Sequence, residues 1–533
     1  MVNTVAVIGS GVSGFTAVKC CLDEGLNPIC FERRDHIAGL WHYTEKEKES
    51  YTTVMKNTIA NISKEMIAFS DFPPAPEFPA YMHNIDLNEY LNMYADKFDL
   101  RKHIWLNTVV VHICETEDHK VTGRWNVKVK DVTSDNINLQ TFDAVLICTG
   151  VFSEPVIPTY AGLEKFKGRL IHTQDYKHSK GFEDKRVVVV GMGNSAVDAA
   201  CDISDVSRQV FISSRNGSWI LARLSKNGHP LDMAMFSRFK YTLVTLFPSL
   251  VNKLLIKQCN NKIDHFRYGI NPKYTPARSN TTINDQLPYK LLIGAVKMKP
   301  DVRRFCGNDV EFVDGTRIQN VDVVVCGTGY LPDFPFLDNS VIGEDKKQLY
   351  LGMFPPERLK HTLATIGCFR IKGPVIPIME MQSRLAARVL KGEVTLPDRD
   401  TMCKSIQANN RESQEKRTYT AHAVTQLDYF PYLDQLAGMI GCKPNFWKLF
   451  FSERALALKC IFGPGTMYQY RLVGPGHWEG AREAIFTQWD RTYYSLSEGK
   501  QTTVPPRKWN IYKLFVLACA VAIAVIAMKC FMQ

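Results

Sequence analysis

The sequence predicts an α/β protein with two Rossmann-like dinucleotide-binding folds, because one strand, turn and helix pattern occurs twice. Residues 4–15 read TVAVIGSGVSGF, and residues 185–200 read KRVVVVGMGNSAVDAA. Each has four apolar residues followed by a Gly-x-Gly-x-x-Gly/Ala turn, which aims helix N–H groups at a pyrophosphate. Matching strand ends follow, FDAVLICTG at 142–150 and VDVVVCGTG at 321–329. This repeat predicts two nucleotide sites on one chain.

The first turn predicts a nucleotide without a 2′-phosphate. The next apolar run, PICFE, ends in Glu32, which lies 23 residues after Gly9. A carboxylate near this offset accepts hydrogen bonds from the adenosine ribose. The expected ligand of the first fold is therefore FAD or NAD.

The second turn predicts NADP. The position 23 residues after Gly191 is Ser214, and Arg215 is next to it. A hydroxyl and a guanidinium can bind a 2′-phosphate, whereas a carboxylate would repel it. The simplest account is one flavin domain and one NADPH domain on a single chain.

The order of the motifs predicts that the NADP domain is inserted in the FAD domain. A long excursion follows the second strand of the NADP fold, and its stretch YTLVTLFPSLVNKLLI has helical spacing. That stretch is either a helix packed on the core or a membrane-facing element. The expected divisions are 1–154 and 331–443 for the FAD domain, 155–330 for the NADP domain with an insertion at about 216–296, and 444–510 for a C-terminal structural region.

Composition excludes several classes of protein. The 533 residues are enough for two or three domains, and the 15 cysteines form no CxxC pair and no cluster at metal-ligand spacing. We expect a reduced compartment, no disulfide framework and no metal. The net charge of +11 comes from lysines and arginines spread along the chain without a basic block. An anionic membrane surface is therefore a better partner than nucleic acid.

The C-terminal end predicts a membrane anchor. Residues 514–528 are an unbroken apolar run, and Lys513 and Lys529 on its flanks extend the segment to 511–532. A buried core helix is the alternative. The N-terminus runs directly into the first strand, so we expect no cleaved signal peptide and a body that faces the cytosol.

A fingerprint before the second turn identifies a family. EKFKGRLIHTQDYK, at 164–177, contains Phe-x-Gly-x-x-x-His-x-x-x-Tyr, which resembles the fingerprint of the flavin-containing monooxygenases. NISKEM, RNGSW, GTGY followed by DFPF, and GPGHWEGAR are also similar to that family. The resemblance covers nearly the whole chain and is closest in type to the membrane-bound animal enzymes.

The resemblance implies cofactor-binding and catalytic residues. Asn61 corresponds to the family's asparagine near the reactive flavin edge, and His172 and Tyr176 to residues that position the two domains. The implied FAD residues are Gly9, Ser10, Gly11, Val12, Ser13, Glu32, Leu40, Trp41, Ala60, Asn61 and Ile62. The implied NADP residues are Gly191, Gly193, Ser195, Ala196, Val197, Asp198, Ser214, Arg215 and Arg223.

Two positions depart from the family pattern. Ile62 stands where Thr or Ser is common, so any hydrogen bond from that side chain to the flavin is lost. Gly327 replaces the usual Ala of an Ala-Thr-Gly-Tyr stretch, and we expect this change to be harmless.

The resemblance also implies an activity and a location. NADPH reduces FAD, dioxygen then forms a flavin C4a-hydroperoxide, and a soft nitrogen or sulfur nucleophile of a lipophilic xenobiotic takes the distal oxygen. Asn61 suits such a dry site because it is uncharged and both donates and accepts. The implied location is the endoplasmic reticulum membrane, with lipid as a partner and a homo-oligomer left open.

Three other functions share features with this one. A flavin disulfide reductase needs a cysteine pair facing the flavin, and none follows Gly39. Baeyer-Villiger oxidation of ketones, or NADPH oxidase activity, uses almost the same scaffold and stays open. A non-enzymatic membrane redox protein is disfavoured because the glycines, Glu32, Asn61 and Arg215 are all intact.

Overall fold

The structure is a computed structural model. It describes residues 2–45, 52–225, 227–276, 279, 281–343, 348–358, 360–371, 373–416 and 426–496. The membrane anchor expected at 511–532 lies outside these ranges. Among the residues within them, no helix has both the length and the apolar character needed to span a bilayer.

The first Rossmann-like unit is a parallel five-stranded sheet in the order β20-β7-β1-β2-β3. Its central strands are buried on both faces, which explains their continuous apolar sequences. The edge strand β20 comes from far along the chain, after the whole second unit. The strands are β1 (Thr4–Ile8), β2 (Asn27–Phe31), β3 (Ile104–Trp105), β7 (Ala144–Ile147) and β20 (Leu363–Thr365).

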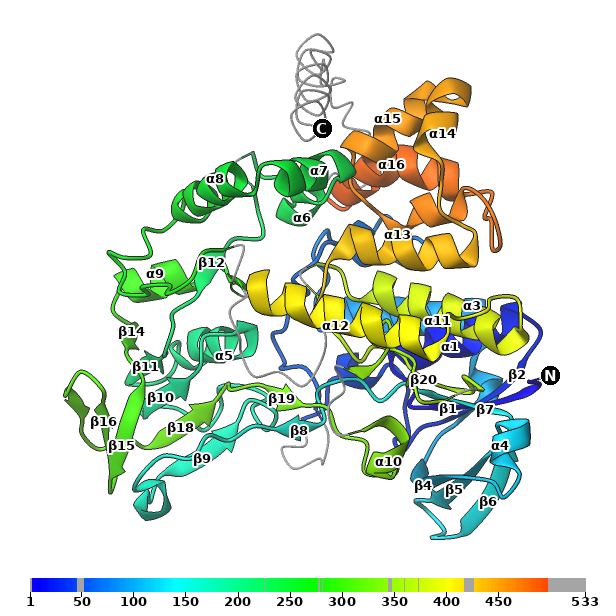
Figure 1. Cartoon of the computed structure of the whole chain (residues 1–533). Coiled ribbons are helices and arrows are strands. Elements are labelled where there is room, and N and C mark those ends of the chain that lie inside the picture. Colours follow the sequence, from blue (N-terminus) through cyan, green and yellow to red (C-terminus); the bar gives the residue numbers. More distant parts are fainter. Residues whose placement is uncertain are drawn as a thin grey trace.

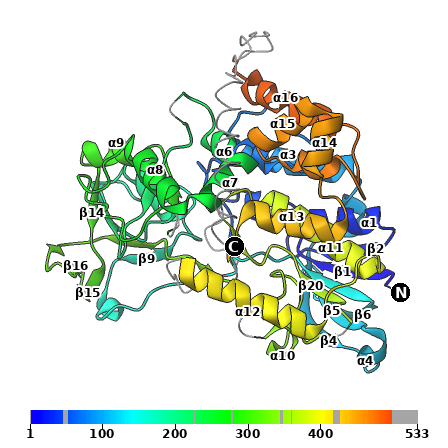
Figure 2. The same ribbon diagram turned by 45° about the horizontal axis from the view of Figure 1, so that its top comes forward.

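The second unit is a parallel sheet in the order β14-β11-β10-β18-β9, which lies beside the first in Figures 1 and 2. Strand by strand, this order matches that of the first sheet. The edge strand β9 precedes its unit in the sequence, however, whereas β20 follows its own. The strands are β9 (Arg169–His172), β10 (Arg186–Val190), β11 (Gln209–Ser213), β14 (Val296–Lys299) and β18 (Val323–Cys326).

Each glycine-rich turn leads into a helix that lies along its sheet. In the first unit, α1 (Val12–Asp23) packs against the long helix α11 (Ile376–Lys391), and the two helices share a buried apolar core. In the second unit, α5 (Asn194–Ile203) has the same position. The structure is therefore a mixed α/β fold whose helix N-termini meet the strand ends at each turn.

The chain between β11 and β14 leaves the second sheet and forms a separate layer of short elements. The apolar run at 241–256 becomes two helices, because Pro248 has no N–H to continue the first one. These elements are β12 (Trp219–Leu221), α6 (Leu231–Met235), α7 (Arg238–Leu246), α8 (Pro248–Asn260), β13 (Thr281–Ile283) and α9 (Leu287–Leu292).

A C-terminal group of helices joins this layer to the first unit. Arg238 of α7 forms two hydrogen bonds of 2.9 Å with the Asp434 carboxylate of α13, and Tyr470 donates to the same carboxylate at 2.6 Å. The helices are α13 (Tyr429–Ile440), α14 (Phe446–Ser452), α15 (Arg454–Phe462) and α16 (Ala481–Tyr494).

Smaller elements complete the described fold. They include an antiparallel sheet beside each unit, β4-β5-β6 and β15-β16-β17. The bounds are α2 (Lys64–Ile67), α3 (Asn84–Lys97), β4 (Thr108–Glu115), α4 (His119–Thr122), β5 (Trp125–Asp131), β6 (Ile137–Phe142), β8 (Glu154–Pro155), β15 (Val302–Cys306), β16 (Asp309–Phe312), β17 (Arg317–Ile318), β19 (Tyr330–Leu331), α10 (Asn339–Ile342), β21 (Arg370–Ile371), α12 (Arg399–Lys416) and β22 (Gln426–Leu427).

Candidate active site

The first glycine-rich turn lies inside the protein. Gly9 has a φ of +96°, and a Cβ added to Gly14 would lie 1.9 Å from the Gly9 carbonyl oxygen. Only glycines therefore let α1 pack directly on the turn. Ser10, Val12 and Ser13 are buried around it. The first N–H groups of α1 are held in a closed site, which fits a tightly bound dinucleotide.

Glu32 is fixed at the end of β2, beside this turn. Its Oε2 atom accepts hydrogen bonds from the Ser10 N–H at 2.8 Å and the Ser10 hydroxyl at 2.9 Å. The Arg34 N–H donates to Oε1 at 3.1 Å. A buried carboxylate oriented in this way still has lone pairs to accept from a ribose, so the residues present fit the adenosine half of FAD.

Leu40 and Trp41 lie against the same turn. They belong to a short 3-10 segment, Gly39–Trp41, and a Cβ on Gly39 would be 2.9 Å from the Gly11 Cα. The Ala38 N–H donates to the Ser10 carbonyl oxygen at 3.1 Å. This close backbone approach places two half-buried apolar side chains next to the predicted pyrophosphate site.

Asn61 lies where the first unit meets the layer after β11. The Ala60 N–H donates to the Met82 carbonyl oxygen at 2.8 Å, which holds the loop. The Arg223 guanidinium donates from Nη2 to Asn61 Oδ1 at 2.7 Å and pairs through Nη1 with Asp285 at 2.9 Å. The structure thus brings together Asn61 and Arg223, which the sequence assigned to different cofactors.

A buried carboxylate that the sequence did not single out supports this loop. Asp232 Oδ2 accepts from both the Ser63 N–H and the Ser63 hydroxyl, each at 2.7 Å. The Tyr81 hydroxyl donates to Asp232 Oδ1 at 3.2 Å and to the Arg223 carbonyl oxygen at 2.6 Å. Burial raises the pKa of Asp232. Only long-range contacts give this residue its role, so no local motif could have indicated it.

The second glycine-rich turn has the same backbone form but opens to solvent. Gly191 has a φ of +122°, and a Cβ there would lie 2.4 Å from the Gly327 carbonyl oxygen. Gly193 and Ser195 are exposed, whereas Ala196 and Val197 are buried beneath them. The N-terminus of α5 is therefore reachable by a coenzyme that binds and leaves.

The departure at Gly327 has a structural explanation. A Cβ on Gly327 would lie 2.4 Å from the Ala196 Cβ. Since carbon atoms cannot approach so closely, an alanine at one of these positions requires a glycine at the other. The unusual glycine at 327 is thus complementary to the alanine that ends the second turn motif.

Asp198 lies on α5, one turn inside the second site. The Asn284 side-chain amide donates to its Oδ1 at 2.8 Å, which ties α5 to the loop after β13. Burial raises the pKa of Asp198 to about 6. The carboxyl group is consequently easier to protonate than an exposed aspartate.

Ser214 and Arg215 follow β11 as Glu32 follows β2. The Ser214 hydroxyl accepts from the Gly217 N–H at 3.1 Å, and the Arg215 side chain is exposed. Burial raises the pKa of Asp301, while the nearby Arg215 guanidinium opposes that shift. The second unit therefore presents a cation to solvent at the place where the first unit buries a carboxylate.

The fingerprint residues His172 and Tyr176 lie at the contact between the units. The Tyr176 hydroxyl donates to the Asp202 carboxylate of α5, and Asn57 of the first unit donates to that same carboxylate at 2.9 Å. The His172 ring contacts Tyr330 edge-on, with ring centroids 4.9 Å apart. Burial lowers the pKa of His172 to about 4, so the ring is neutral near pH 7.

Comparisons with known proteins agree with this geometry. A family model described as flavin-binding monooxygenase-like matches residues 2–532. The N-oxide-forming dimethylaniline monooxygenase 2 of Mus musculus is 42% identical over 496 residues, 92% of each chain. Flavin-containing monooxygenase 5 of Homo sapiens is 40% identical over 491 residues, 91% of this chain and 92% of that protein.

Solved structures show the same fold at lower identity. The S-allyl-L-cysteine S-oxygenase of Allium sativum has a TM-score of 0.64 at 21% identity, covering 92% of this chain and 99% of that one. An NADP+-bound cyclohexanone monooxygenase from Rhodococcus sp. Phi1 has a TM-score of 0.59 at 16% identity, covering 83% and 98%. Taken with the relatives at 40% and 42% identity, the family match means that the chain belongs to the flavin-binding monooxygenases and is an NADPH-dependent flavin-containing monooxygenase.

Proposed function

We propose that this monooxygenase uses NADPH and O2 to oxygenate soft nitrogen or sulfur atoms of lipophilic small molecules, with FAD as its flavin. The observation that carries this proposal is the 2.7 Å contact between Asn61 and Arg223, which places an uncharged amide where the two units meet. The relatives' names, an N-oxide-forming dimethylaniline monooxygenase and an S-oxygenase, support this substrate class.

FAD would be held by the first turn, by Glu32, and by Leu40 and Trp41. When bound, FAD supplies the hydride acceptor and the centre that reacts with dioxygen. NADP would lie on the N-terminus of α5, with its 2′-phosphate near Ser214 and Arg215. The proposal thus assigns a closed site to the flavin and an open site to the coenzyme.

Asn61 orients a polar ligand without adding a charge. Its Oδ1 accepts from Arg223, and among the described residues none accepts from its amide N–H groups, which are left to donate to a ligand. Arg223 and the Asp232–Ser63 contacts hold the loop on either side of Asn61. These contacts let the amide exclude a competing water and direct the oxygen atom to the substrate.

The Asn61→Ala variant tests this role. It should bind FAD and accept hydride from NADPH at wild-type rates, because hydride transfer precedes oxygen chemistry. Hydrogen peroxide released per NADPH should then rise severalfold, since a protected step becomes exposed to water. The measurement is peroxide, NADPH and sulfoxide product in the same assay with a sulfide substrate. Asn261→Ala, an exposed asparagine of the layer after β11, is the control.

Arg223→Gln sharpens the test, because it removes the charged donor from Asn61 while keeping a hydrogen-bonding side chain. Peroxide release should rise in the same direction as for Asn61→Ala. Normal coupling in Asn61→Ala would contradict the proposal and make Asn61 a structural residue.

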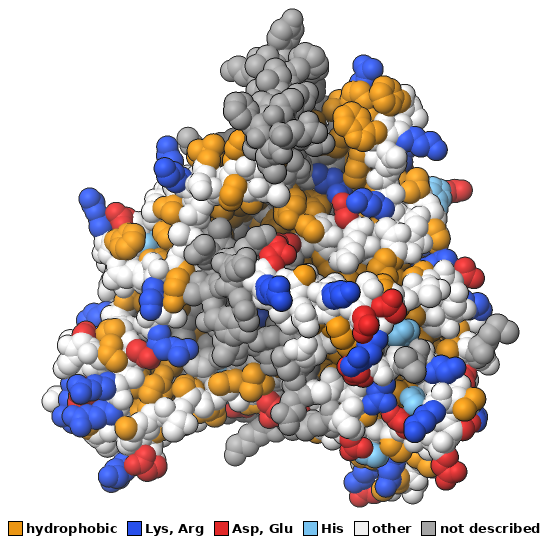
Figure 3. Space-filling view, in the orientation of Figure 1, with side chains coloured by type: hydrophobic (Ala, Val, Ile, Leu, Met, Phe, Trp, Pro, Cys, Tyr) orange, Lys and Arg blue, Asp and Glu red, His pale blue; other side chains and the backbone are white. Residues whose placement is uncertain are grey.

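We also infer that the enzyme is bound to the endoplasmic reticulum membrane by residues 511–532 and by an apolar surface, with its body in the cytosol. Helices α7 and α15 are in contact, and α7, α8, α14 and α15 lie at one end of the molecule in Figure 1. Hydrophobic side chains gather at that end in Figure 3. Trp447 and Phe451 of α14 are 78% and 82% exposed, and Lys448 and Arg454 are exposed beside them. Exposed aromatics beside cations favour a membrane interface with anionic lipid.

Truncation after Pro506 separates the two contributions. The full chain should resist alkaline extraction from membranes, whereas the truncated chain should bind phosphatidylserine-containing vesicles only weakly and reversibly. Trp447→Ser with Phe451→Ser should weaken that residual binding about tenfold or more, because two aromatic rings that would be buried in the bilayer are lost. Leu292→Ser, which alters an equally exposed leucine of α9, is the control. Equal vesicle binding by both variants would contradict the inference that α14 contacts the membrane.

A further inference from the structure

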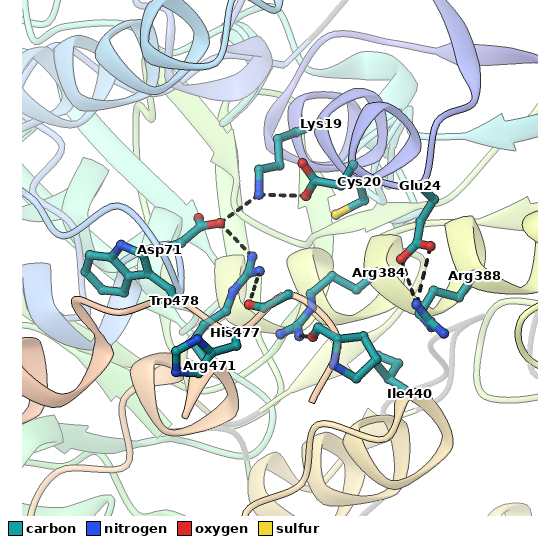
Figure 4. A pocket seen from close by; sticks show the side chains of 13 residues that line it. Lys19, Cys20, Glu24, Asp71, Arg384, Arg388, Ile440, Arg471, His477 and Trp478 are labelled. Carbon is teal, nitrogen blue, oxygen red and sulfur yellow. Dashed lines mark hydrogen bonds and ion pairs between the residues drawn. The ribbon is translucent and has the colours of Figure 1, made fainter. Parts of the chain in front are cut away.

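A polar cavity of about 520 Å³ lies apart from both glycine-rich turns. It is lined by the C-terminal half of α1, by Asp71, by α11, by the end of α13 and by residues 471–478 (Figure 4). Its first α1 residue, Lys19, is six residues beyond Ser13, a rise of about 9 Å along the helix axis. No residue of either nucleotide turn lines it. The cavity is therefore a separate site that the proposed reaction does not use.

Most of the charged side chains in its wall are already paired. The Asp71 carboxylate lies 2.7 Å from Lys19 Nζ and 2.8 Å from Arg471 Nη2, and Arg471 also reaches Glu380 at 3.0 Å. Lys19 pairs with Asp23 at the rim, at 2.7 Å. In Figure 4, Lys19 of α1 and Arg471 of the 471–478 segment both reach the Asp71 carboxylate. Both cations meet the Asp71 carboxylate at Oδ2, while its Oδ1 atom is buried without a hydrogen-bond partner among the described residues.

Arg384 is the exception. It is only 6% exposed, and it donates to the carbonyl oxygens of Tyr470 at 3.3 Å and Pro475 at 3.0 Å. Within the described ranges, no carboxylate forms an ion pair with it. One turn further along α11, Arg388 pairs with Glu24 at 3.0 Å, but its Nε atom is buried without a partner. The Asp71 carboxylate acts on the Arg384 guanidinium from beyond ion-pair distance. A buried guanidinium without a directly paired carboxylate is costly, which favours an anion beside it.

The backbone of the loop at 474–477 lies over the guanidinium groups of Arg471 and Arg384. Gly476 has a φ of +72°, and a Cβ there would lie 2.6 Å from Arg471 Nη1 and 3.4 Å from Arg384 Nη2. The positive φ favours glycine at this position, and the absence of a side chain lets the backbone lie close to both guanidinium groups. Trp478 and Ile440 add an apolar wall on the same cavity. The lining thus combines a cationic end with a surface for an organic group.

We propose that this cavity binds a small organic molecule with one oxyanion, a carboxylate or a phosphate monoester. The oxyanion pairs with the Arg384 guanidinium, whose fork of N–H donors matches two oxygens, and the Arg388 Nε lies one helical turn away. The organic group lies against Trp478 and Ile440. The volume is in the range of sites for small ligands. Asp23 and Glu24 at the rim disfavour molecules that carry several negative charges.

Calorimetric titration of the full-length, FAD-loaded enzyme in non-ionic detergent tests the proposal. Saturating NADP+ is present throughout, so that anions do not compete for the exposed site near Arg215. Benzoate and inorganic phosphate are the two probes, and they distinguish a carboxylate ligand from a phosphate ligand. Benzamide, which has the shape of benzoate without its charge, is the control. At least one anion should bind with a stoichiometry of one, and benzamide should not bind.

Variants then locate the binding. Arg384→Gln should weaken the anion about tenfold or more, and Arg388→Gln should weaken it less, because Arg388 already has a carboxylate partner. Arg399→Gln, which breaks an exposed ion pair with Glu357, should leave it unchanged. Should Arg384→Gln fail to fold, Arg384→Lys keeps the charge but loses the fork, and should still weaken binding. The proposal is overturned if neither anion binds, or if the variants that fold at 384 and 388 bind like Arg399→Gln.

Discussion

The two nucleotide units share a strand order but differ in what they show to solvent. In the first, the turn residues Ser10, Val12 and Ser13 are buried. In the second, Gly193 and Ser195 are exposed at the corresponding turn. Under the proposed function, one fold would hold both a cofactor that stays and a coenzyme that must exchange at every turnover. The first two glycines of the motif are the same in both units and the third position differs, Gly14 against Ala196. The difference in exposure therefore reflects the packing around the turn.

The residues after the second strand of each unit extend the contrast. Glu32 is buried and accepts three hydrogen bonds from neighbouring backbone and hydroxyl groups. Arg215 is exposed, with Asp301 nearby. A ribose can be held by a fixed, preorganised carboxylate, whereas a phosphate arriving from solvent is attracted by an accessible cation.

The largest effect is expected from Gly14→Ala, which places in the first turn the residue that the second turn has at 196. The added Cβ would lie 1.9 Å from the Gly9 carbonyl oxygen, so α1 must move away. We expect a loss of about 3 kcal/mol or more in stability and loss of bound flavin. Flavin per protein after gel filtration measures it. Gly193→Ala has no atom within 4 Å of its new Cβ and should keep its flavin. Equal flavin loss in both variants would show that the tight packing at Gly14 is not what retains the flavin.

A smaller effect is expected at the complementary pair of the second unit. Gly327→Ala should destabilise that unit by about 2 kcal/mol, because its Cβ would meet Ala196. Adding Ala196→Gly should recover about half of the loss, since the Cβ contact disappears while a 2.8 Å contact with the Cα persists. Urea unfolding of the four proteins of this cycle gives the coupling energy. Additive effects would show that the two positions are independent.

The smallest effect of the three is expected from Arg215→Ala. NADPH binding should weaken roughly tenfold, about 1.4 kcal/mol, while NADH is little affected. Steady-state kinetics with both coenzymes measure the change. Arg208→Ala, an exposed arginine before the start of β11, is the matched control. An unchanged preference for NADPH over NADH would show that Arg215 does not bind the 2′-phosphate.

Local patterns were enough to predict the parallel α/β units, because glycine spacing and apolar runs determine turns and buried strands over about 30 residues. The patterns did not predict where a single residue interrupts an element. Pro248, for example, divides an apolar stretch of helical spacing into α7 and α8. The candidate site was harder. Arg223 meets Asn61 across 162 residues, and Asp232 meets Ser63 across 169. A side chain's partner at such a separation leaves no periodic signal in the sequence.

The edge strand β20 has a consequence for how this chain folds as it is synthesised. Leu363 of β20 pairs with Val145 of β7, so the first sheet stays incomplete until more than 360 residues have left the ribosome. All five strands of the second sheet, ending at Cys326, emerge before then. The inserted unit can therefore fold first. The apolar face of α1 stays uncovered until α11 has been synthesised. Contacts of such high sequence separation fold slowly, and the nascent first half is the part that most needs chaperone protection.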